Sequence, residues 1–96
     1  MKNPAQTQAI SGQWCLVTVR QWKRDTFVKH LQNELTQKQL QEIILEIIEP
    51  EESVYDNMVI LRVTSYLETR KILQSIEYFH AVQRLKPDEV SRMLNS

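Results

Sequence analysis

Four carboxylates in the middle of the chain come closest, by type and spacing, to residues that do chemistry. They are Glu46, Glu49, Glu51 and Glu52. Neighbouring carboxylates can act as a general acid and base or bind a cation. Catalysis would also need a base or a nucleophile beside them, and the sequence offers none there. Adjacent acids in a loop are usually solvated, so we predict that the protein is not an enzyme.

The histidines, the cysteine and the glycine give no stronger signal. His30 and His80 lie about fifty residues apart without neighbouring ligands, whereas a metal site needs several ligands at close spacing. Cys15 is the single cysteine and is expected to be a core thiol, because no base or helix start adjoins it. Gly12 is the single glycine, so a glycine-rich phosphate loop cannot form. We therefore expect no metal, cofactor or small-molecule ligand.

The length and charge of the chain narrow the classes of partner. The 96 residues suit one domain with a single core. Twelve basic and twelve acidic residues cancel, so no strong field favours nucleic acid or a membrane surface. No segment approaches the roughly 18 apolar residues of a membrane span, and no signal-like apolar core opens the chain. With a lone cysteine, these features predict a cytoplasmic protein.

Hydrophobic periodicity divides the chain into a tail and one domain. Residues 1–13 are polar and are predicted to form a flexible tail, and residues 14–96 to form the domain. The predicted strands are 14–20, 42–49, 58–64 and 79–85, and the predicted helices are 25–39, 66–76 and a short one from Pro87. Asp25 is the expected cap of the first helix, and Ser65 with Glu68 has the spacing of a capping box for the second.

The order of these elements predicts an α+β fold. Two strand–helix–strand crossovers, each right-handed, close into one antiparallel sheet. The expected architecture is a ferredoxin-like βαββαβ sandwich, in which a four-stranded sheet carries two helices on one face and a short C-terminal helix follows. Such a sheet leaves its second face open.

Alternation along the strands sorts residues between the two faces. The small apolar sets suit the face under the helices. These sets are Cys15, Val17 and Val19 in the first strand and Val59, Leu61 and Val63 in the third. The opposite face then carries an apolar patch flanked by two arginines. It comprises Trp14, Leu16, Met58 and Ile60, with Thr18 beside them and Arg20 and Arg62 at the rim. An apolar patch with a charged rim is typical of a protein-binding site.

Other uses of this face stay open. The tail, or the terminal helix through Val90, Met93 and Leu94, could fold over it and bury it. Two copies of the chain could also pair face to face as a homodimer. An RNA-recognition sheet is disfavoured, because the third strand lacks the interleaved aromatic residues on which bases stack.

Several segments of the chain also follow the order and spacing that a known protein family shows. A Trp opens the first strand and an amphipathic helix follows it. Then come "IIEPEESVYDNMVILRV" and, at the end, "RLKPDEVSRML". Together, from Trp14 to Leu94, they resemble the N-terminal domain of NusG-type transcription elongation factors. The first quoted segment is similar to that family's Val-Pro-x-Glu-Glu-Val stretch leading into Phe-Pro-Gly-Tyr-Val.

The resemblance implies a partner and a site. In that family, aromatic residues at the strand entry and residues of the first strand form a hydrophobic depression for the clamp helices of RNA polymerase. Carried across, Tyr55 stands at the Phe position and Met58 at the Tyr position, while Asp56 and Asn57 replace Pro-Gly. Asn tolerates a positive φ, and methionine adapts to helices of varied shape. The expected partner-binding residues are Trp14, Leu16, Thr18, Arg20, Tyr55, Met58 and Ile60.

The chain departs from the family pattern at three places. The second aromatic is missing, the loop before Met58 is short and acidic, and the SH3-like KOW domain that normally follows is absent from these residues. We predict a non-enzymatic module of transcription elongation or antitermination that binds the polymerase clamp helices. The alternative is a protein-interaction or homodimerisation domain without a polymerase role.

Overall fold

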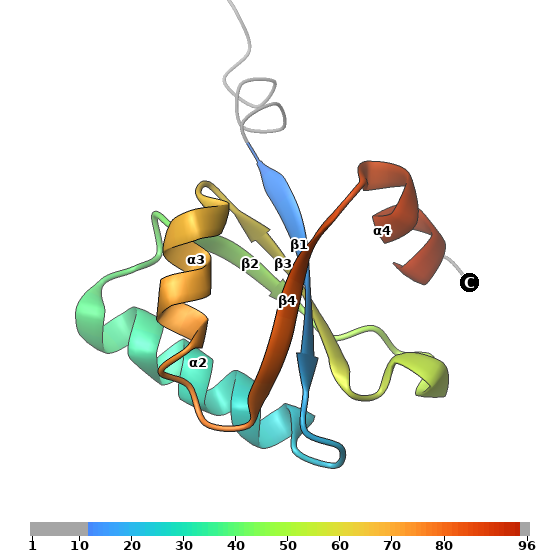
Figure 1. Ribbon diagram of the computed structural model, residues 1–96, viewed down its shortest axis with the longest axis horizontal. Coiled ribbons are helices and arrows are strands. Elements are labelled where there is room, and N and C mark those ends of the chain that lie inside the picture. Colours follow the sequence, from blue (N-terminus) through green and yellow to red (C-terminus); the bar gives the residue numbers. More distant parts are fainter. Residues whose placement is uncertain (1–11, 95–96) are drawn as a thin grey trace, which may run out of the picture.

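The computed structural model describes residues 12–94. These residues form four strands and three helices, arranged as Figure 1 shows. Their bounds are β1 Gln13–Val19, α2 Arg24–Lys38, β2 Ile44–Ile48, β3 Met58–Val63, α3 Tyr66–Leu73, β4 Phe79–Leu85 and α4 Pro87–Leu94. A 3₁₀ turn, η1 Ser53–Tyr55, lies in the connection between β2 and β3. Of the predicted tail, residues 1–11 lie outside the described residues, and Gln13 already belongs to β1.

The four strands form one antiparallel sheet in the order β2-β3-β1-β4. The central pair brings Val17 opposite Val59 and Cys15 opposite Leu61. The predicted α+β class and four-stranded antiparallel sheet are confirmed, and this arrangement is compatible with a ferredoxin-like sandwich. β1 and β3 are the two inner strands of the sheet.

One predicted helix start is right and the other is wrong. Ser65 caps α3 as expected, since its Oγ accepts a hydrogen bond from the Glu68 N–H at 3.1 Å. Asp25 does not cap α2, because the helix begins one residue earlier, at Arg24, and within residues 12–94 no side chain caps its first turn. The Asp25 carboxylate instead stands in that first turn, where the helix dipole favours negative charge.

The main core fills the space between the sheet and the helices α2 and α3 (Figure 1). The alternation prediction is confirmed there, because Cys15, Val17 and Val19 are fully buried together with Val59, Leu61 and Val63. The helices contribute an apolar stripe that lies against them. Its buried members are Phe27, Val28, Leu31 and Leu35 from α2, and Leu73 from α3. Burying each such large side chain stabilises the fold by about 1.5–3 kcal/mol.

The second face of the sheet is covered in part, which corrects the expectation of an open face. Helix α4 lies over it, on the side opposite α2 and α3 (Figure 1). Val90 and Met93 pack there on Ile60, and the three have exposed fractions of 6%, 8% and 0%. Their spacing of three residues puts Val90 and Met93 on one side of the helix. The apolar residues of α4 and of the sheet thus remove each other from water.

Candidate functional site: a cleft beside the C-terminal helix

Helix α4 leaves a cleft between itself and the connection that leads into β3. The cleft has a volume of about 290 Å³. It is lined by Leu16, Tyr55, Met58, Gln83, Leu85, Glu89, Arg92 and Met93. Toward the sheet its wall is apolar apart from Gln83, and Glu89 and Arg92 place one charge of each sign on the α4 side.

The pairing of the strands explains why these residues meet. Leu16 lies in the middle of β1, opposite Ile60 of β3 on one side and Gln83 of β4 on the other. Thr18 lies opposite Met58, the first residue of β3. Because directly opposite residues in a sheet share a face, the alternating residues of three strands form one continuous floor.

The structure gathers most of the predicted partner-binding residues on this face. Trp14, Leu16, Tyr55 and Met58 are partly buried and belong to one apolar cluster with Ile60. Leu16, Tyr55 and Met58 line the cleft itself. Ile60 belongs to the same cluster but is fully buried under α4.

The two polar residues predicted for this site behave differently from each other. Thr18 is half-buried beside Met58. Arg20 follows the end of β1 and is exposed, and its backbone N–H donates to the Tyr78 carbonyl at 2.9 Å. Arg20 is therefore not among the residues that line the cleft.

Sequence reasoning missed the side of the cleft that β4 and α4 provide. Leu85 and Met93 line it, and both carry a signal in the sequence. Leu85 lies opposite Trp14 in the sheet, so alternation along β4 would have placed it on the same face. Met93 lies in the terminal helix, which the sequence suggested as a cover for the sheet face and not as one side of a cleft.

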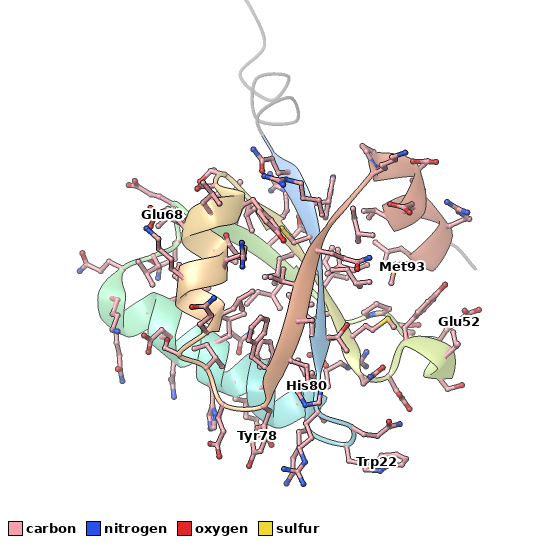
Figure 2. The ribbon with its side chains drawn as sticks, viewed as in Figure 1. Trp22, Glu52, Glu68, Tyr78, His80 and Met93 are labelled. Carbon is pink, nitrogen blue, oxygen red and sulfur yellow. The ribbon has the colours of Figure 1, made fainter. Side chains whose placement is uncertain are left out.

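A second hollow, of about 270 Å³, adjoins α4 on the side of the β2–β3 connection. It is lined by Ile48, Glu49, Glu51, Glu52, Met93 and Leu94. Met93 lines both hollows and thus separates them. Figure 2 shows Met93 and Glu52 on the same side of the molecule, across the sheet from Glu68 of α3. The apolar cleft is thus bordered by acidic side chains.

The four clustered carboxylates of the central segment have separate surroundings. Glu46 forms an ion pair with Arg62, with 2.9 Å between Oε1 and Nε. Glu49 forms one with Arg24 at 3.3 Å, and Glu51 and Glu52 are exposed. Two of the four are therefore engaged with arginines and two face solvent.

Arg24 is the residue that sequence reasoning missed altogether. Its Nη1 donates hydrogen bonds to the backbone carbonyls of Pro50, Tyr55 and Met58, at 2.9, 3.0 and 3.2 Å. The side chain is 18% exposed. The three acceptors lie 26, 31 and 34 residues away in the chain, so no local spacing rule could have identified them.

The electrostatics around Arg24 involve two carboxylates. Burial raises the pKa of the Glu49 carboxyl above its usual value, and a hydrogen bond with the Asp25 side chain raises it further, while the charge of Arg24 acts in the opposite direction. A carboxyl that shares a hydrogen bond with a second carboxyl holds its proton more tightly.

Among residues 12–94, no three His, Cys, Asp or Glu side chains are grouped so that they could hold a metal ion. Within the same part of the chain, no helix has the length and apolar character to cross a membrane. Neither the comparison with protein-family models nor the one with curated proteins gave a match to this chain.

Proposed function

We propose that this protein is a non-enzymatic, ferredoxin-like binding module similar to the N-terminal domain of NusG-type factors. It binds the clamp helices of RNA polymerase, acts in transcription elongation or antitermination, and works in the cytoplasm. The observation that carries the proposal is the cleft itself. Three residues chosen from strand alternation and from the family resemblance, namely Leu16, Tyr55 and Met58, line one hollow.

The chemistry of the cleft suits a helical partner. An amphipathic helix binds a groove through apolar side chains at every third or fourth position. Methionine side chains at Met58 and Met93 can adapt to such a surface because they are unbranched and flexible. A charged rim around an apolar centre is the usual anatomy of a protein interface.

The acidic border adds a preference for the partner's charge. Glu51 and Glu52 are exposed beside Met93. A partner helix that places basic residues there would gain electrostatic attraction, which salt weakens. We therefore expect binding to weaken as ionic strength rises.

The test is an NMR titration of the isotope-labelled chain with a helical hairpin that copies the polymerase clamp helices. We expect shift changes concentrated at Leu16, Tyr55 and Met58, and their loss in the double variant Tyr55→Ala/Met58→Ala. If both residues are hot spots, each truncation costs more than about 1 kcal/mol, so the double variant should bind roughly thirtyfold more weakly, or weaker still.

The matched control is Val54→Ala. Val54 lies in the same 3₁₀ turn as Tyr55 but is 68% exposed, so its truncation should leave binding unchanged. Absence of any shift at submillimolar hairpin would overturn the proposal. Sedimentation at several concentrations then tests the alternative, because a dimer that buries Trp14 and Leu16 would make this face a self-association surface.

A further inference from the structure

The connection between β2 and β3 is held in place mainly by contacts with other parts of the chain. Within η1, the Tyr55 N–H donates to the Glu52 carbonyl at 2.9 Å and the Asp56 N–H to the Ser53 carbonyl at 3.1 Å. These bonds are local and fix the turn but not its position on the molecule. Its position depends on longer-range contacts, one of which runs from the Val19 N–H to the Asn57 carbonyl at 2.9 Å.

The other long-range hydrogen bonds that the described residues make to this connection come from Arg24. Its Nη1 donates to the carbonyls of Pro50, near the start of the connection, of Tyr55, near its end, and of Met58, the first residue of β3. Its Nε faces Glu49 at 3.3 Å. One guanidinium therefore fastens the whole connection to the first turn of α2.

A guanidinium suits this set of contacts because two of its nitrogens are used at once. The two N–H groups of Nη1 are shared among the three carbonyls, while Nε, fixed in the same plane, faces the carboxylate of Glu49. A lysine ammonium carries the same charge on a flexible stem and cannot hold that geometry. Hydrogen bonds from a charged donor are also stronger than neutral ones.

We infer that Arg24 is a positioning residue of the cleft, which fixes the β2–β3 connection in the shape that presents Tyr55 and Met58 to a partner helix. The inference rests on the proposed function for the identity of the partner. The positioning itself concerns the free chain, because two of the three carbonyls that Arg24 holds belong to residues that line the cleft. Arg24 itself is not among the residues that line it.

The experiment compares Arg24→Ala and Arg24→Lys with the unaltered chain, both free and with the clamp-helix hairpin. In the free chain we expect amide shift changes and faster hydrogen exchange confined to residues 49–58 and the start of α2. With the hairpin we expect about tenfold weaker binding in both variants, the size of one lost charged hydrogen bond or slightly more.

Chemical rescue separates positioning from a general loss of stability. Millimolar ethylguanidinium should restore both the loop shifts and the affinity of Arg24→Ala, whereas ethylammonium should not. Arg70→Ala is the control, because Arg70 is an exposed arginine on α3, the other helix on the same face of the sheet as α2. Arg24→Lys serves as the second variant should Arg24→Ala unfold.

The outcomes are distinguishable. Unchanged loop shifts in Arg24→Lys, or changes spread through the main core, would overturn the positioning role. Altered loop shifts with unchanged hairpin affinity would overturn it as well, since the shape of the connection would then not control binding. If the unaltered chain binds no hairpin, the proposed partner fails, and the loop shifts and their rescue still decide whether Arg24 holds the connection.

Discussion

The two faces of the sheet are formed by the same strands but are covered by helices to different extents. Under α2 and α3, Val17, Leu61 and Phe27 are fully buried in a continuous core. Under α4, Ile60 is fully buried, but Leu16 and Met58 beside it are only partly so. Two helices, α2 and α3, close one face, whereas α4 alone covers the centre of the other and leaves its margin as a cleft.

The difference separates stability from recognition. A face that is sealed by two helices contributes mostly to the free energy of folding, because packing there resembles the interior of any small protein. A face that is sealed only at its centre keeps apolar side chains within reach of a partner. Substitutions on the two faces test this division between stability and recognition.

The largest expected effect is on stability, from truncation inside the sealed face. Leu61→Ala should lower the free energy of unfolding by about 2–5 kcal/mol, since it removes a fully buried side chain and leaves a cavity. Met93→Ala on the other face should cost less, about 2 kcal/mol or below, because the cleft beside Met93 is already open to solvent. Urea denaturation of the two variants measures the difference, and equal losses would contradict the comparison.

The next largest effect concerns the reactivity of a thiol at two neighbouring positions of β1, 15 and 16. Cys15 points into the sealed face and is fully buried, and burial raises the pKa of its thiol from 9.0 to about 11, against the opposing charge of Arg84. It should react with a thiol reagent only when the chain unfolds. In the variant Cys15→Ala/Leu16→Cys, the new thiol lies in the cleft and should react in the folded state.

The pH dependence of Cys15 has a definite sign. Its folded pKa lies above the unfolded value, so its stabilising contribution is fully present below pH 9 and declines as pH rises toward about 11. Cys15→Ala should remove that decline. A folded chain whose Cys15 reacts as fast as the thiol at position 16 would show that the first face is not sealed.

The smallest effect is expected at Glu49, near the base of the connection. Because burial and Asp25 raise its pKa in the folded chain, the charged carboxylate is disfavoured there and stability improves as pH falls toward the usual value of 4.5. Glu49→Gln should therefore leave stability at neutral pH unchanged or slightly higher, and should flatten this part of the pH dependence. Urea unfolding at several pH values measures it.

Variants of Glu49 and of Arg24 should also differ in their effect on the β2–β3 connection. If the backbone carbonyls, and not the ion pair with Glu49, hold the connection, Glu49→Gln should keep the loop shifts that Arg24→Ala loses. A loss of loop order in Glu49→Gln as large as that in Arg24→Ala would assign the connection to the ion pair instead.

Local patterns in the sequence determined most of the elements. The alternation in β1 and β3 predicted which residues face the helices, since neighbouring side chains of a strand point to opposite faces. The Ser65 cap and Pro87 predicted where α3 and α4 begin, because both act within one helical turn. The bounds of β4, Phe79–Leu85, were predicted to the residue.

The tertiary structure determined the features that depend on residues far apart in the sequence. The sequence left open whether the tail, α4 or a second copy covers the second face, because each offers apolar surface and periodicity does not rank them. It also favoured Asp25 as a cap, whereas α2 begins at Arg24. The hydrogen bonds of Arg24 span 26 to 34 residues, and such contacts exist only once the sheet has brought the segments together.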